Sequence, residues 1–139
     1  MKRIDNIEPY TLRLTIAGEV PNPEGIIATL LTDVAERCQD AGGPLVGHIK
    51  CYASTASGNF HCSLTSLRIG TQCSTLPLAA ELQLGRIDVD LAILVYGLER
   101  ETIDSLTRAS VDALCRARGV TWEVLSSSAA HNHPDPACS

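Results

Sequence analysis

RIDVDLAILVY, residues 86–96, is the clearest strand in the chain. Its odd-numbered positions are all branched apolar residues, namely Ile87, Val89, Leu91, Ile93 and Val95. After Arg86, its even-numbered positions carry Asp88 and Asp90 and then Ala92, Leu94 and Tyr96. Because successive side chains of a strand point to opposite faces, the stretch predicts a strand with one face in the core and one mixed, outward face.

A second pair of alternating segments precedes this strand. Residues 46–53 and 59–67, within VGHIKCYASTASGNFHCSLTSL, are separated by small polar residues and predict a hairpin. If Ser54–Ser57 forms a four-residue loop, Lys50 lies opposite His61 and His48 lies opposite Ser63.

The remaining elements complete an α+β pattern. The alternation of residues 10–17 predicts a strand, residues 120–125 predict a last short strand, and apolar residues at helical spacing predict helices after Asn22-Pro23 and from Glu99 to about Arg118. Residues 68–85 are compatible with a short helix around Pro77–Leu82 or with an edge strand. The order β-α-β-β-(irregular)-β-α-β predicts a ferredoxin-like two-layer sandwich, with a mainly antiparallel sheet and both helices on one face.

The composition indicates one small domain. The chain has 139 residues, which is enough for one core, so we expect a single domain over residues 1–126 and a flexible tail over 127–139. The formal charge of −5 argues against nucleic-acid binding, which needs clustered cations. No apolar run is long enough for a membrane span and no export signal is seen, so we expect no membrane partner and a cytoplasmic location. The six cysteines are widely spaced and include no Cys-x-x-Cys, which favours reduced, mostly buried thiols.

Alternation divides the hairpin's metal-binding residue types between two faces. The apolar face includes Cys51 and Cys62, so both cysteines are expected in the core. The polar face carries the candidate ligand-binding residues of the hairpin, and neighbouring strands add more: His48, Lys50, His61, Ser63, Arg13, Asp88 and Asp90. The split excludes a four-ligand Cys/His zinc site within the hairpin.

Three interpretations of the polar face stay open. It can be the ordinary wetted side of an antiparallel sheet. It can be a subunit interface, because Ala92, Leu94 and Tyr96 make one end apolar. It can be a ligand, metal or catalytic site with His48 and His61 as ligands or proton carriers.

The end of the chain holds a second candidate site. His131, His133 and Cys138, with Asp135 between them, are soft and borderline ligands in a segment without apolar periodicity. Such a cluster predicts weak capture of a divalent transition metal such as zinc as a cofactor. An ordinary disordered terminus is the alternative.

A family resemblance starts from Gly47-His48-Ile49-Lys50, continues through the hairpin ending Ser63-Leu64-Thr65, and includes the strand 89–97 and the helix after it. This arrangement resembles the C-terminal accessory region of CobW-type metallochaperone GTPases. The resemblance implies an accessory α+β domain linked to metal handling, partner choice or regulation. The chain lacks the Walker A glycine loop and the family's Cys-x-Cys-Cys motif. The resemblance therefore implies neither GTPase activity nor the family's metal site.

We therefore expect a small accessory domain that binds a protein partner, a metal or a small anion, and that forms a homo-oligomer or joins a protein partner. The alternative is a small enzyme that uses His48 and His61 for acid–base chemistry on the open sheet face. No Gly-x-Ser-x-Gly, phosphate-binding glycine loop or His-Glu-x-x-His supports catalysis.

Overall fold

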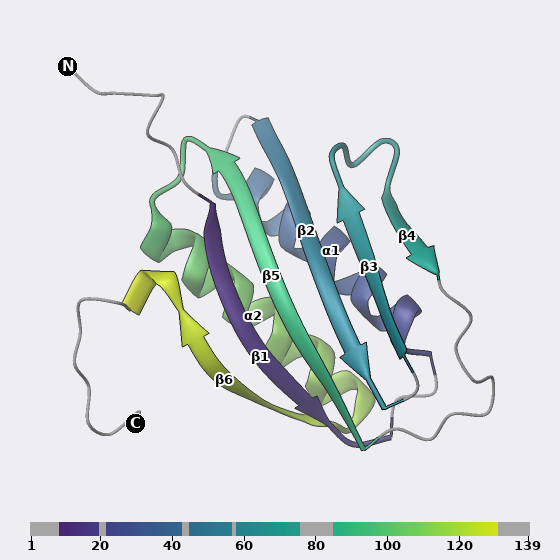
Figure 1. Ribbon diagram of the computed structural model, residues 1–139. Coiled ribbons are helices and arrows are strands. Elements are labelled where there is room, and N and C mark those ends of the chain that lie inside the picture. Colours follow the sequence, from purple (N-terminus) through teal and green to yellow (C-terminus); the bar gives the residue numbers. More distant parts are fainter. Residues whose placement is uncertain (1–8, 20–21, 43–44, 57, 76–84, 131–139) are drawn as a thin grey trace.

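A six-stranded antiparallel sheet forms one layer of the molecule (Figure 1). The computed structural model describes residues 9–19, 22–42, 45–56, 58–75 and 85–130. The strand order across the sheet is β4-β3-β2-β5-β1-β6. The strands are β1 (Tyr10–Ala17), β2 (Leu45–Thr55), β3 (Gly58–Leu64), β4 (Thr71–Thr75), β5 (Arg86–Tyr96) and β6 (Thr121–Ser127).

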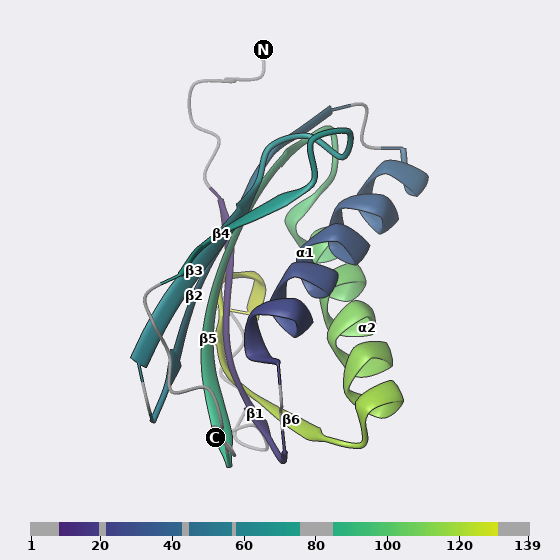
Figure 2. The ribbon, with the colours of Figure 1, turned by 90° about the vertical axis from the view of Figure 1, so that its right-hand side faces the viewer.

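Two helices form the second layer and lie on the same side of the sheet (Figure 2). Helix α1 spans Pro23–Asp40, and the Asn22 side chain caps its start by accepting a hydrogen bond from the Gly25 N–H at 3.1 Å. Helix α2 spans Arg100–Arg118 and ends at Gly119, whose φ of 71° is the left-handed conformation common just after a helix. Both predicted helices are confirmed. Among the described residues, no helix is long and apolar enough to cross a membrane.

The core lies between the sheet and the helices. The five odd-numbered side chains of β5 are all buried, as are the even-numbered side chains of β1 from Tyr10 to Ile16. From the other layer, α1 buries Ile26, Ile27, Leu30, Leu31, Val34, Ala35 and Cys38. The alternation read from the sequence therefore fixes which face of each central strand meets the helices, and it leaves the opposite face uncovered by the described elements.

The hairpin between β2 and β3 is tighter than expected. Thr55 pairs with Gly58, so only two residues connect the strands instead of four. Lys50 consequently lies opposite Ser63, and Tyr52 lies opposite His61. The predicted pairs Lys50 with His61 and His48 with Ser63 are wrong. The partner of Lys50 differs from the predicted one by two positions, so the assignment of side chains to the two faces is still correct.

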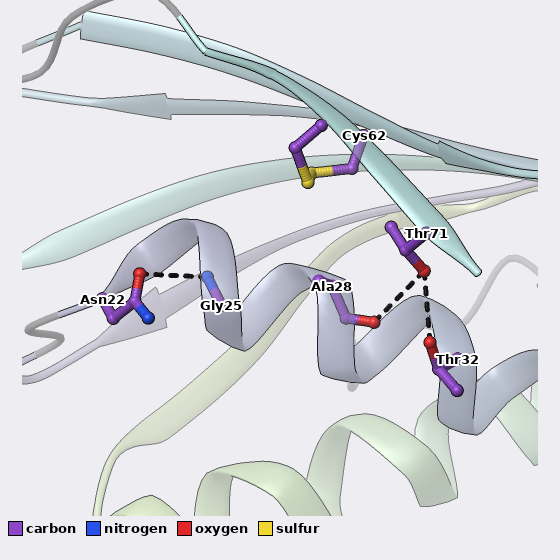
Figure 3. Close-up of a disulfide and its surroundings, with 7 residues drawn as sticks. Asn22, Gly25, Ala28, Thr32, Cys62 and Thr71 are labelled. Carbon is purple, nitrogen blue, oxygen red and sulfur yellow. Dashed lines mark hydrogen bonds between the residues drawn. A yellow bond between two sulfur atoms is a disulfide. The ribbon is translucent and has the colours of Figure 1, made fainter. Parts of the chain in front are cut away.

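The part of residues 68–85 that the structure describes contains the edge strand β4, which pairs with β3. Cys62 of β3 and Cys73 of β4 form a disulfide, with Cα atoms 3.9 Å apart (Figure 3). The prediction of reduced thiols is wrong for this pair, because the two residues face each other across a strand pair that the sequence did not reveal. Cys38, Cys51 and Cys115 are free and buried, as predicted. The proposed helix around Pro77–Leu82 lies outside the described residues.

The opposite edge of the sheet is fastened by hydrogen bonds instead. Tyr10 donates its hydroxyl proton to Asp104 of α2, and Ser127 of β6 donates to the same carboxylate oxygen at 3.0 Å. Burial, followed by the hydrogen bond to Asp104, raises the pKa of Tyr10 well above its usual value. Because β6 includes Ser127 and a short 3₁₀ turn follows at Ser128–Ala130, ordered structure continues past the start of the expected tail at residue 127.

Candidate functional site

The uncovered face of the sheet carries all seven sequence-predicted ligand residues. They alternate with buried neighbours along four strands, as the burial of Leu12, Ile49 and Leu91 shows. By strand, they are Arg13 of β1, His48 and Lys50 of β2, His61 and Ser63 of β3, and Asp88 and Asp90 of β5. The face is shared, but only some of these residues are neighbours.

A shallow hollow of about 370 Å³ lies on this face over β1, β5 and β2. Three of the seven predicted residues, Arg13, Lys50 and Asp90, line it. The other lining residues are Thr11, Leu12, Tyr52, Leu91, Ala92 and Ser126. Its volume lies at the small end of the range for small-molecule sites, and its lining combines apolar groups with a few charged and hydroxyl groups, as in many such sites.

Arg13 and Asp90 are partners of each other in the hollow. They face each other in the pairing of β1 with β5, and Arg13 Nε lies 2.7 Å from Asp90 Oδ1. Their side chains are 62% and 51% exposed, so this ion pair adds at most about 1 kcal/mol to stability. Its main effect is local, because each charge already has an opposite charge beside it.

Lys50 has no such partner. Its side chain is exposed, and no described residue forms a hydrogen bond or an ion pair with its ammonium group. Its neighbours in the two strand pairings are the uncharged residues Ala92 and Ser63. Lys50 therefore brings an uncompensated positive charge to the hollow.

Tyr52 is an aromatic lining residue that was not among those predicted from the sequence. It is 65% exposed, and its ring centroid lies 5.4 Å from that of His61 in a tilted arrangement. The exposed ring offers the hollow an apolar surface with a polar hydroxyl at its end. The available signal was the alternation itself, which puts Tyr52 two residues after Lys50 on the same face.

The two histidines are not brought together. His61 pairs with Tyr52, whereas His48 pairs with Leu94. Along β2, His48 and the Tyr52 that pairs with His61 are four positions apart, which corresponds to about 13 Å in an extended strand. A direct shared role in acid–base chemistry is therefore not built into this geometry.

A bulge in β2 sets the position of His48. The pairing of β2 with β5 shifts between Val46 and His48, and Gly47 is the extra residue. A Cβ atom on Gly47 would lie 2.5 Å from the Leu94 carbonyl oxygen, so only glycine fits here. Nδ1 of His48 is buried and has no hydrogen-bond partner among the described residues.

Asp88 belongs to a separate group beyond the hollow. Its Oδ1 accepts hydrogen bonds from Thr15 Oγ1 at 2.9 Å and from Arg86 Nε at 3.0 Å. The hydrogen bond from Arg86 holds the pKa of Asp88 below its usual value. Because its partners are supplied by the chain, Asp88 has a structural role on this face.

The metal prediction finds no support within the described part of the chain. Over residues 9–130, apart from the gaps given above, no group of three or more His, Cys, Asp or Glu side chains is arranged to hold an ion. His131, His133 and Cys138 lie outside the described residues, so the predicted tail site stays a prediction.

Comparisons with family models, with curated proteins and with solved structures found no match. The chemistry of the open face must therefore be inferred from its own side chains.

Proposed function

We propose that this protein is a non-catalytic accessory domain that binds a small organic anion in the hollow on its open sheet face. The observation that carries the proposal is that the unpartnered Lys50 ammonium and the exposed ring of Tyr52 line the same hollow. Of the three functional classes expected from the sequence, a protein partner, a metal or a small anion, the small anion fits this arrangement best.

The charge arrangement supports an anion rather than a cation. Arg13 is already compensated by Asp90, so the uncompensated charge at the hollow is that of Lys50. A carboxylate at Lys50 would form a charge-assisted hydrogen bond, which is about twice as strong as a neutral one. A divalent metal would instead meet this ammonium group and one carboxylate that is already engaged.

The remaining lining supports a ligand with a flat apolar body. The Tyr52 ring and the Ala92 methyl group offer apolar contact, while Thr11 and Ser126 offer hydroxyl groups at the side. An aromatic carboxylate would place its ring against Tyr52 and its charge at Lys50. Benzoate is the simplest probe of this class.

The fold assignment is part of the proposal. Without β3 and β4, the elements follow the order β-α-β-β-α-β, and their strands lie in the order β2-β5-β1-β6. This order supports a ferredoxin-like sandwich in which β3 and β4 extend the sheet beyond β2. The resemblance to the accessory region of CobW-type GTPases, and with it a link to metal handling, is likewise a proposal.

Assembly and location complete the proposal. Tyr96 is 37% exposed at the end of β5, and with Leu94 it supports a subunit contact at that end of the open face, away from the hollow. We also propose a cytoplasmic location, where a disulfide is typical of redox regulation rather than of a static staple. The alternative of an enzyme using His48 and His61 remains a prediction without a supporting contact.

Calorimetric titration with benzoate tests the anion proposal. We expect saturable binding to the wild type and an affinity at least about tenfold lower for Lys50→Gln, because a hydrogen bond to a charged group contributes about 1.5–3 kcal/mol. Arg116→Gln is the matched control, since it removes one positive charge from an exposed position on α2. Equal affinity in all three proteins would refute the assignment of Lys50.

A further inference from the structure

Three cysteines form one row across three neighbouring strands. In the strand pairing, Cys51 of β2 lies opposite Cys62 of β3, and Cys62 lies opposite Cys73 of β4. The buried Cys62 side chain faces α1, where Figure 3 shows the disulfide. Cys51 is buried on the same face and is a free thiol.

In this row, the free thiol of Cys51 is the strand-pairing neighbour of a cysteine that takes part in a disulfide. Cys62 is bonded to Cys73 on one side, and the directly paired residue on its other side is Cys51. Thiol–disulfide exchange proceeds when a thiolate attacks one sulfur and the other sulfur leaves. Cys51 and Cys73 are paired with Cys62 from opposite sides, so the attacking and the leaving cysteine lie on different neighbouring strands.

We propose that this row is a thiol–disulfide exchange site, in which Cys51 attacks Cys62 and moves the disulfide from the β3–β4 pair to the β2–β3 pair. The Cys51 thiol loses its proton and its sulfur bonds to the Cys62 sulfur. The Cys62–Cys73 bond breaks, its electron pair stays on the Cys73 sulfur, and that sulfur takes up a proton. One thiol and one disulfide are present before and after, so the step needs no oxidant or reductant.

The surroundings keep the resting state stable and give the exchange a consequence. Burial, and to a smaller extent the Asp90 charge, raises the pKa of the Cys51 thiol to about 12, so little thiolate is present at neutral pH and the exchange is slow. After exchange, Cys73 is a free, partly exposed thiol on the edge strand. Strand β4 then loses its covalent link to β3 and keeps its backbone pairing and the Thr71 contacts with Thr32 and Ala28 of α1.

Trapping with iodoacetamide under native, thiol-free conditions tests the exchange. Trypsin cuts after Lys50, Arg68 and Arg86, so Cys51 and Cys62 share the peptide 51–68 while Cys73 lies in the peptide 69–86. In the resting protein a disulfide joins these two peptides. Exchange instead yields an internal disulfide in 51–68 and an alkylated Cys73 in 69–86, which mass spectrometry distinguishes.

We expect the trapped form to accumulate with time in the wild type and to be lost in Cys51→Ser. Cys38→Ser is the matched control, since it removes another buried free thiol, and it should trap Cys73 as the wild type does. Absence of Cys73 alkylation in the wild type would overturn the proposal, and so would undiminished alkylation in Cys51→Ser. Alkylation of Cys38 and Cys115 as fast as Cys73 would also overturn it, because the trap would then report unfolding.

Discussion

The two faces of the sheet are built from alternate residues of the same strands, yet they do different things. On the covered face, Leu91 and Cys51 are paired and buried beneath the helices. The adjacent pair along the same two strands, Ala92 of β5 with Lys50 of β2, lies on the open face. The covered face contains the buried core side chains and the cysteine row, whereas the open face carries the exposed polar side chains and is the face that we propose binds a ligand.

The largest loss of stability is expected from a substitution on the covered face. Leu91→Ala removes a fully buried side chain from the central strand and should lower the free energy of unfolding by about 2–5 kcal/mol. Lys50→Ala, on the open face of the neighbouring strand β2, should change this free energy by less than about 0.5 kcal/mol. Urea denaturation measures both. Similar losses for the two variants would contradict the division of roles between the faces.

The next largest loss of stability is expected at alkaline pH, through the buried Cys51 thiol on the covered face. The pKa of Cys51 is about 12 in the folded chain and 9.0 in the ordinary thiol, so the folded state holds this proton more tightly. The resulting stability is fully present below about pH 9 and is lost as the pH rises toward 12, by up to about 4 kcal/mol. Urea denaturation of the unreduced protein between about pH 8 and pH 10 should show this decline.

Cys51→Ala isolates the contribution of this thiol from those of other groups that titrate in the same range. Its unfolding free energy should fall less steeply with pH than that of the wild type. An unchanged slope would mean that Cys51 is not protected by burial.

The sequence predicted the two faces well because alternation depends only on neighbouring residues. It assigned Arg13, Lys50 and Asp90 to one face correctly, and these three line the hollow. It could not give the β2–β3 pairing, because a two-residue connection and a four-residue loop leave the faces the same. The disulfide was missed for a related reason, since Cys73 pairs with Cys62 only through the edge strand β4.

A smaller effect is expected at the bulge on the open face. Gly47→Ala would place a Cβ atom 2.5 Å from the Leu94 carbonyl oxygen, so the strands must shift locally. We expect a loss of about 1–3 kcal/mol in unfolding free energy, the usual range for overpacking. The matched control Gly42→Ala concerns a glycine with no atom within 4 Å of such a Cβ but with a φ of 101°, so its cost is backbone strain alone. Backbone NMR shifts at Leu94 and His48 should therefore change in Gly47→Ala and not in Gly42→Ala.

The most direct test of the central claim is a map of where an anion binds. We predict that benzoate, added to ¹⁵N-labelled protein, shifts the backbone amide signals around Arg13, Lys50 and Ala92 in a saturable manner. Signals of the helix residues on the covered face, such as Leu30 and Val111, should stay in place. Shifts confined to the helices, or no saturable shift at the hollow, would contradict the assignment of the open face as the binding face.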